Sequence, residues 1–307
     1  MSRLAAPITI AAALLGCGSR DAGRVDGSPG DVTTDSPIDA GPRCDVTSPF
    51  GPPSLVDGVN TTDDDRWGWE SADGLTIYFA RAPAGGEAFD LYVATRGDPE
   101  APFSATSVLA TSTPFSEKRP VVTADGLTLY METTGSASDT DIRVATRTDT
   151  TVDFPSSVSI AGVDGPKNEF NPWISGDGLT LYFTSDRDGY NDIFMTTRAT
   201  ADASFATPVA VTELNSAYGD YMGALRGDGL EIFFGSSRDT NLANDDIFHA
   251  TRASPSEPFG ATSKIAELSG ATTNEYPSWV SADGCQLLFT SNRGGAGYDI
   301  WLASRPQ

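Results

Sequence analysis

The sequence predicts an all-β fold, a five-bladed β-propeller with four antiparallel strands in each blade, and three recurring features support this prediction. Successive Asp-Gly pairs, from Asp73 on, are 52, 52, 51 and 55 residues apart. Successive arginines that end a unit, from Arg96 on, are 51, 51, 54 and 53 residues apart. Successive phenylalanines, from Phe50 on, are 53, 51, 51 and 54 residues apart. A shared period near 50 residues is typical of propeller repeats.

Each repeat contains four short β-forming segments, which the third repeat shows well. We expect strands at residues 171–175, 179–184, 192–198 and 205–211, the last being the outermost strand. Asp177-Gly178 predicts a type I′ hairpin turn, because glycine accepts the positive φ that this turn requires. The second segment, LTLYFT, is apolar on both faces, as expected for a strand that lies between neighbouring blades.

Composition limits the function classes. The 307 residues include 20 Lys+Arg and 42 Asp+Glu, a net charge of −22, which argues against binding to nucleic acid or to an anionic membrane surface. His249 is the only histidine and replaces an apolar residue of the repeat, so we expect it to be structural. No G-x-S-x-G nucleophile motif or phosphate-binding glycine loop is present, so we expect no catalytic residue, cofactor or metal. Calcium at 186–192 is kept as an alternative, although the EF-hand spacing is missing.

The N-terminal segment reads as a targeting signal followed by a tether. Residues 1–16 have the basic start and short apolar run of a secretory signal peptide. Leu14-Leu15-Gly16-Cys17 resembles the bacterial lipobox, and the resemblance implies lipidation of Cys17, with the outer membrane favoured. An ordinary signal peptide is the alternative. Residues 17–48, rich in Asp, Gly, Ser and Pro, are expected to form a disordered tether, and 49–307 the propeller.

The repeat resembles the TolB-type, WD-like β-propeller repeat. The third unit carries the pattern as Glu169, Pro172-Trp173-Ile174-Ser175-Gly176-Asp177-Gly178, Leu181-Tyr182-Phe183-Thr184-Ser185-Asp186-Arg187 and Asp192-Ile193-Phe194. The resemblance covers nearly all of the chain after the tether. It implies a bacterial envelope protein whose partner is another envelope protein, whereas the fold alone says little about function.

The repeat also predicts how the ring closes. The chain has a fourth-strand segment at 50–56 before the first complete unit and finishes on a third-strand segment at 299–304, so the former should complete the last blade. Cys44 and Cys285 map to one end of that blade. A Cys44–Cys285 disulfide would lock the ring in an oxidising compartment, and two unrelated thiols are the alternative.

Five acidic residues stand eight positions before the Asp-Gly aspartates, at the expected start of each innermost strand, near one mouth of the central channel. We expect three of them to form structural acid–Arg–Asp clusters, in which an arginine lies between two carboxylates. These clusters are Glu169–Arg187–Asp192, Asp220–Arg238–Asp246 and Glu275–Arg293–Asp299.

Asp65 and Glu117 lack an arginine at the matching position, so we expect them, with Trp67 and Trp69, to form a ligand-binding surface at the channel mouth. The sequence therefore predicts a monomeric, non-enzymatic scaffold that binds an envelope protein, a peptide or a polysaccharide and touches the membrane only through its lipid. A carbohydrate-active hydrolase that uses channel-mouth carboxylates is the alternative, since paired carboxylates cleave glycosidic bonds.

Overall fold

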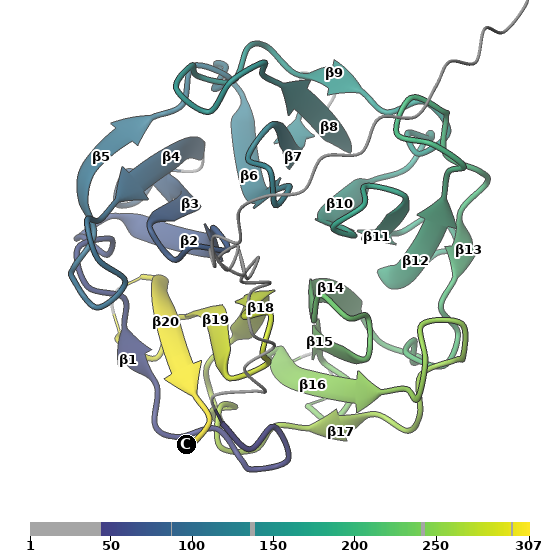
Figure 1. Ribbon diagram of the computed structural model, residues 1–307. Helices are drawn as coiled ribbons and strands as arrows, with labels where there is room; N and C mark the ends of the chain where they lie inside the picture. The colour runs from purple at the N-terminus through teal and green to yellow at the C-terminus, as the bar shows by residue number, and fades with distance from the viewer. Residues whose placement is uncertain (1–43, 87, 136–138, 241–242, 296) are drawn as a thin grey trace, which may run out of the picture. The chain divides into compact units, whose positions relative to one another are not determined.

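The computed structural model describes residues 44–86, 88–135, 139–240, 243–295 and 297–307. In these ranges the chain forms five four-stranded antiparallel sheets around a central axis, with no helix and therefore none that could cross a membrane (Figure 1). The predicted all-β, five-bladed propeller is confirmed. The predicted signal peptide, the lipidation of Cys17 and residues 17–43 of the predicted tether lie outside the described residues.

Each blade runs from an innermost strand to a short outermost strand. Blade one contains β2 Asp64–Glu70, β3 Thr76–Ala82, β4 Asp90–Thr95 and β5 Ser104–Val108. Blade two contains β6 Ser116–Val122, β7 Thr128–Thr134, β8 Thr140–Thr146 and β9 Val158–Ser159. Blade three contains β10 Glu169–Ile174, β11 Thr180–Ser185, β12 Asp192–Thr197 and β13 Val209–Ala210. Blade four contains β14 Asp220–Leu225, β15 Glu231–Ser236, β16 Asp246–Thr251 and β17 Ser263–Lys264. Blade five contains β18 Glu275–Val280, β19 Gln286–Ser291, β20 Asp299–Ser304 and, from the N-terminal side, β1 Ser54–Leu55.

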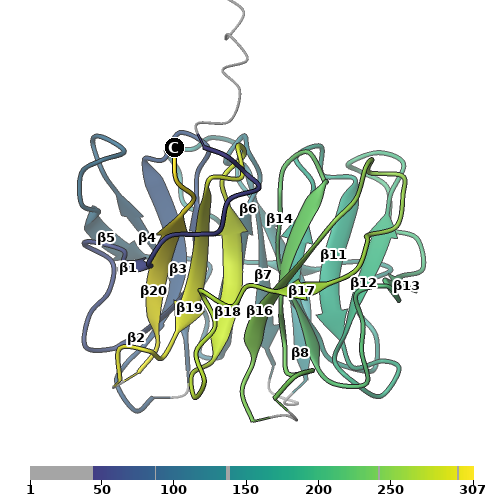
Figure 2. The same cartoon turned by 90° about the horizontal axis from the view of Figure 1, so that it is seen from below.

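The hydrophobic core lies between the blades. The second strand of each blade presents apolar side chains on both faces, and all six residues of β15 are buried. Phe79, Phe183, Phe234 and Phe289 occupy matching places on these strands and are fully buried. The side view shows the sheets standing next to one another around the axis (Figure 2). A strand buried on both faces needs this composition, which explains the apolar run in each repeat.

The ring closes through the predicted strand. β1 pairs antiparallel with β20, with Ser54 opposite Leu302, and the Gly51 N–H donates to the Ser304 carbonyl at 2.8 Å. Cys44 and Cys285 form a disulfide with their Cα atoms 5.7 Å apart, as expected, and the alternative of two unrelated thiols is not observed. Residues 44–48, which we placed at the end of the tether, thereby belong to the folded blade.

The Asp-Gly turns differ in type from the prediction. The Gly178 N–H donates to the Ser175 carbonyl at 2.8 Å, and Gly178 has φ of 70°. Asp177 does not have a positive φ, whereas type I′ requires one at both central residues. The turn is therefore a type I turn followed by a left-handed glycine. Asp177 fixes it by accepting hydrogen bonds from the Ser175 hydroxyl and the Leu179 N–H.

The arginine that ends each unit connects the three recurring features. Arg198 donates from Nε to the Gly178 carbonyl at 2.7 Å, and its guanidinium lies 4.6 Å from the centre of the Phe205 ring. The arginine thus ties the Asp-Gly turn, the third strand and the phenylalanine of the outermost segment together. The same stacking recurs in the other blades, at Arg96–Phe103, Arg147–Phe154, Arg252–Phe259 and Arg305–Phe50.

Candidate functional site: the channel mouth

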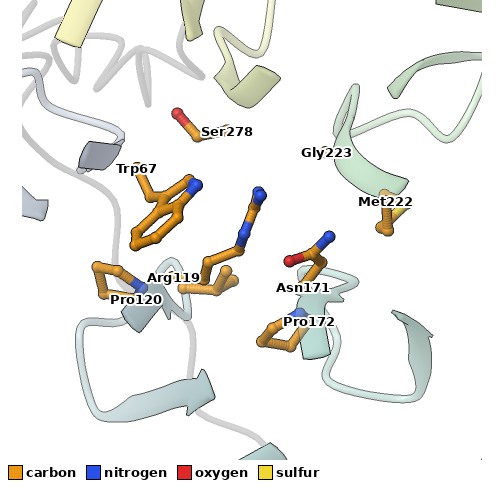
Figure 3. Close-up of a pocket in the computed structure, with 9 residues that line it drawn as sticks. Trp67, Arg119, Pro120, Asn171, Pro172, Met222, Gly223 and Ser278 are labelled. Atoms are coloured by element: carbon orange, nitrogen blue, oxygen red, sulfur yellow. The ribbon is translucent and has the colours of Figure 1, made fainter. Parts of the chain in front are cut away.

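A β-bulge interrupts every innermost strand at the same level of the channel. The pairing with the second strand shifts after Arg66, Lys118, Phe170, Met222 and Pro277. At three of these bulges a non-glycine residue adopts a left-handed backbone, with φ of 56° at Trp67, 51° at Arg119 and 54° at Asn171. Such conformations cost of order 1–3 kcal/mol each and cluster at functional sites. The bulges turn these three side chains toward the channel (Figure 3).

The channel is nearly filled at this level. The remaining cavity measures about 10 Å³, which is room for about one water molecule. Arg119 extends into its centre, between Trp67, Asn171 and Ser278 (Figure 3). Among the described residues, no carboxylate lines this cavity. Only a slim chemical group can therefore enter from the mouth.

Arg119 is a buried cation with weak compensation. Its side chain is 11% exposed, and the nearest carboxylate oxygen, Oε2 of Glu132, lies 4.0 Å from its Nε. The guanidinium lies 4.9 Å from the centre of the Trp67 ring and 5.7 Å from that of Tyr276. Burial lowers the pKa of Arg119 to about 10, while the negative charge of Glu132 opposes this shift. The guanidinium consequently remains protonated at neutral pH.

Two concentric sets of side chains surround the mouth outside this cavity. The inner set comes one position after the five strand-starting acids and consists of Arg66, Lys118, Phe170, Tyr221 and Tyr276. The outer set comes one position before the third strands and includes Phe89, Asn191, Asp245 and Tyr298. Backbone hydrogen bonds across the blade seams fix the two sets relative to each other. In each bond, the N–H of the acid before an inner residue donates to the carbonyl of an outer residue; the pairs are Asp65–Tyr298, Glu117–Phe89, Asp220–Asn191 and Glu275–Asp245. The rim is therefore a fixed frame.

Two cations of the inner set stack on aromatic rings of the outer set. The Arg66 guanidinium lies 3.9 Å from the centre of the Tyr298 ring and 5.0 Å from that of Phe89. Lys118 Nζ lies 5.7 Å from the Phe89 ring centre. Both side chains keep about a fifth of their surface exposed, 20% for Arg66 and 24% for Lys118. Cationic groups thus face solvent at the mouth of a strongly acidic protein.

Aromatic rings complete the rim on the side of blades three to five. Phe170 and Tyr221 lie 6.3 Å apart by ring centres, Tyr221 and Tyr276 lie 6.5 Å apart, and Tyr276 and Tyr298 lie 6.3 Å apart. The Tyr276 hydroxyl donates to Asp245 at 2.8 Å. Burial, together with the charge of Asp245, raises the pKa of Tyr276, so this hydroxyl stays protonated. All four rings are half-buried and present part of their surface to a ligand.

The structure buries both acids that we expected to bind a ligand. Asp65 has no exposed surface, and its carboxylate accepts hydrogen bonds from Arg81 Nε at 2.6 Å and from the Thr61 hydroxyl at 2.8 Å. Arg81 therefore replaces the arginine that blade one lacks at the matching position. Glu117 is 1% exposed, has no arginine partner and accepts hydrogen bonds from the backbone and hydroxyl of Thr113. This burial leaves contact with a ligand to the residues that follow the acids.

The two tryptophans that we expected at the channel mouth lie in different environments. Trp67 lines the channel cavity. Trp69 packs against the hydrophobic clusters of several blades, and its indole N–H donates to the Val122 carbonyl at 3.0 Å. Trp69 therefore contributes to the core.

The structural acid–arginine pairs form as expected, but the third member of each cluster does not join. Arg187 binds Glu169 at 2.9 Å, Arg238 binds Asp220 at 2.6 Å, and Arg293 binds Glu275 at 3.3 Å. Each guanidinium also donates to a backbone carbonyl of the preceding loop, at Val163, Leu214 and Leu268 respectively.

Asp192, Asp246 and Asp299 make no hydrogen bond or ion pair with these arginines within the described ranges, so each arginine pairs with the strand-starting acid alone. The arginines turn toward the preceding loop and stack on aromatic rings, as Arg187 does on Phe183 and Phe194. Asp246 instead binds Lys264 at 2.6 Å.

Sequence reasoning missed Arg66, Lys118, Arg119, Tyr276 and Tyr298. A signal was available for four of them: the repeat alignment that found the acids places Arg66, Lys118 and Tyr276 directly after an acid, and Tyr298 directly before an aspartate. The direction of Arg119 depends on the bulge and was not visible in the alignment.

A second hollow, of about 470 Å³, lies beside blade four near the N-terminal segment 46–50. His249 is found there, with Nδ1 3.2 Å from Oε1 of Glu231, and Arg305 donates to the same carboxylate at 2.7 Å. Together these contacts lower the pKa of Glu231, although its burial acts in the opposite direction. Arg305 connects blade five to blade four, so we assign the cluster a structural role. No group of three potential metal ligands occurs in the part of the chain that the structure describes.

The fold is similar to that of solved proteins with different activities. TolB from Acinetobacter baumannii matches with a TM-score of 0.50 and 14% identity, over 80% of this chain and 55% of that chain, so the chain spans about half the length of that TolB. The catalytic domain of a GH62 α-L-arabinofuranosidase from Coprinopsis cinerea matches with a TM-score of 0.54 and 13% identity, over 84% and 97%. An endo-arabinase from Bacteroides thetaiotaomicron matches with a TM-score of 0.54 and 14% identity, over 83% and 98%.

No protein-family model and no curated protein matches the sequence. The identities to the solved structures are low, so the likeness shows the fold alone. The chain has a TolB-like β-propeller fold, which it shares with carbohydrate-active enzymes.

Proposed function

We propose that this protein is a non-enzymatic β-propeller that holds a protein, peptide or polysaccharide partner at its channel mouth in the bacterial cell envelope. The observation that carries the proposal is the rim: partly exposed cations and aromatic rings on a frame fixed by hydrogen bonds across the blade seams. Aromatic and arginine side chains dominate the binding energy of protein interfaces, and a rigid frame lowers the entropy cost of binding.

The envelope location and the lipid anchor rest on the lipobox-like tetrad that ends at Cys17 and on the likeness to TolB. Metabolic labelling of the full-length chain with an alkyne fatty acid, compared with a Cys17→Ser variant, tests the anchor. Label on the wild type alone supports lipidation of Cys17, whereas equal labelling of both would contradict it.

Hydrolysis of a carbohydrate is the second candidate, favoured by the likeness to the arabinose-cleaving enzymes. That chemistry needs two carboxyl groups about 5 to 9.5 Å apart on either side of the scissile bond. No described residue lining the channel cavity is acidic, and the nearby carboxylates have other partners. Glu132 accepts the Asn171 N–H, and Asp245 accepts the Tyr276 hydroxyl. The geometry therefore favours binding over hydrolysis.

Site-specific photocrosslinking in the native organism tests the proposal. A crosslinking amino acid replaces Lys118 at the mouth in one strain and the exposed Ala201, between β12 and β13, in a control strain. We expect a partner that is captured from position 118 and not from 201. In parallel, the purified wild type should release no sugar from arabinan or xylan. Capture from 201 alone, or turnover that is abolished by Glu132→Gln, would contradict the binding role.

A further inference from the structure

Arg119 differs from the other arginines of the described ranges, because it is the one that makes no hydrogen bond. Each of the others donates to a carboxylate, a carbonyl or a hydroxyl, as Arg187, Arg238 and Arg293 do. The Arg119 guanidinium, only 11% exposed, has a carboxylate oxygen 4.0 Å from its Nε and ring faces farther away. A guanidinium this far shielded from solvent normally binds a carboxylate or carbonyl oxygen, so Arg119 has donors to offer to a further acceptor.

A second donor at the same place also lacks a partner. Trp67 is 8% exposed, lines the same cavity as Arg119, and its indole N–H is buried without a hydrogen bond to any described residue. The indole nitrogen and the guanidinium both face the interior of the channel (Figure 3). Both residues have the strained left-handed backbone that brings them there. Two unsatisfied donors thus converge on one water-sized space.

Resting on the proposed function, we infer that this space receives a carboxylate of an acidic peptide, which Arg119 and the Trp67 indole N–H would bind while the peptide chain lies across the aromatic and cationic rim. A carboxylate is flat and presents two acceptor oxygens, so it matches the forked donors of a guanidinium. Arg66, which pairs with Asp64 at 2.6 Å, and Lys118, whose Nζ lies 3.9 Å from Glu132 Oε1, place further cationic groups at the entrance.

The size of the space favours a peptide over an acidic polysaccharide. A cavity of about 10 Å³ has room for about one water-sized group, so it can receive one carboxylate oxygen of a slim side chain or of a chain terminus, whereas a uronic acid carries its carboxylate directly on a sugar ring. The half-buried rings of Phe170, Tyr221 and Tyr276 provide stacking surface for apolar peptide side chains beside the carboxylate.

A peptide library provides the test. Random hexapeptides with free C-termini are selected on the immobilised folded protein, and the enriched peptides are resynthesised as C-terminal amides and with Asp or Glu changed to Asn or Gln. We expect one of the two neutralisations to weaken binding at least 10-fold in fluorescence anisotropy, which identifies the carboxylate as terminal or as a side chain. Arg119→Gln should lower the affinity for the charged peptide at least 30-fold, and this variant should bind the neutralised and charged peptides with equal affinity.

Three further variants serve as controls for this test. Trp67→Phe keeps a smaller aromatic ring and removes the N–H, and should weaken binding about 10- to 150-fold, in line with the loss of one hydrogen bond to a charged group. Arg143→Gln, an arginine on the outer side of the same blade as Arg119 that bonds to Ser157 and Ser159, should bind as the wild type does. Arg119→Lys retains the charge and loses the forked donors, so its affinity for the peptide should lie between that of Arg119→Gln and that of the wild type. Circular dichroism and the melting temperature verify that each variant is folded.

Several outcomes would overturn the inference. The first is that the enriched peptides bind equally well with and without a carboxylate. The second is that folded Arg119→Gln binds these peptides with the affinity of the wild type. The third is that the protein binds oligogalacturonate in place of peptides and that this binding depends on Arg119. Each of these leaves the proposed function standing if the position-118 crosslink still captures a partner. Failure of that crosslink, by contrast, would remove the proposed function itself.

Discussion

At the scale of single residues, ionisable groups in this propeller differ in how well burial is compensated. Asp65 and Asp220 are fully buried, and each has an arginine at 2.6 Å. No cation of the described residues pairs with Asp164: one carboxylate oxygen accepts the Ile160 N–H at 3.2 Å, and the other is buried without a hydrogen bond to any of these residues. Burial, with the nearby charges of Asp141 and Glu169, raises the pKa of Asp164 to about 6 from an ordinary 3.8.

This shift predicts a pH-dependent gain from Asp164→Asn. Because the folded state holds the Asp164 proton more tightly than the unfolded state, the contribution of this group to stability is fully present below about pH 3.8 and is lost as the pH rises through about 6. The asparagine variant should therefore be more stable than the wild type at pH 8, with the difference shrinking to near zero at pH 4. Urea unfolding at both pH values measures it, and a pH-independent difference would contradict the assignment.

At the scale of elements, the acid–arginine pairs fix the loops that lead into the innermost strands. In blade four, Arg238 binds Asp220, donates to the Leu214 carbonyl and the Ser236 hydroxyl, and stacks on Phe234 and Phe248. One side chain thereby joins the loop before β14 to the strands β15 and β16. Asp220 is fully buried, whereas Arg238 is 17% exposed, so removing the arginine leaves an uncompensated buried carboxylate.

Arg238→Met should consequently destabilise the fold by about 3 kcal/mol, within the range for a broken buried ion pair. The double variant Arg238→Met/Asp220→Asn should recover part of this loss, since it removes the orphaned charge. Equilibrium urea unfolding gives both values, with Arg143→Met as a surface control. A double variant as unstable as the sum of the single ones would show that the two groups do not interact.

At the scale of the whole molecule, the ring depends on how the first and last strands of the propeller meet. β1 contributes only two residues to its pairing with β20, and the Cys44–Cys285 disulfide fixes the same seam. The Arg305–Glu231 pair holds the last strand against blade four. Since the bond closes a loop over a sequence separation of 241 residues, it restricts the unfolded chain strongly.

Reduction of this disulfide should lower the free energy of unfolding by about 2–5 kcal/mol, the usual range for a native bond. A thermal scan with and without a reducing agent measures the change, and hydrogen exchange at the amides of β20 should become faster. The Cys44→Ser/Cys285→Ser variant should melt like the reduced wild type and ignore the reducing agent. Equal melting temperatures for oxidised and reduced wild type would show that β1 alone secures the ring.

The sequence by itself determined the number of blades, the position of the three inner strands and which segment closes the ring, because every repeat contains the same local signals. The outermost strands are shorter than expected, since the segment at 205–211 pairs only at Val209–Ala210. An Asp-Gly turn, an apolar second strand and a closing arginine each act over a few residues or one blade. Their pattern can therefore be recognised in the sequence alone. The same alignment predicted the three acid–arginine pairs, whose members are all set by one repeat.

Only the tertiary structure decided which side chains meet at the channel. The bulge at Arg119 reverses the direction of a side chain that strand alternation would place differently, and a one-residue shift in a strand moves a residue to the other face. Arg66 meets Tyr298 because the first blade closes against the last, across more than 200 residues of chain. The burial of Asp65 and Glu117 follows from the loops just before them, where Thr61 and Thr113, four residues earlier, bind the two carboxylates. The spacing of the repeat does not show how these loops fold back over the strand starts.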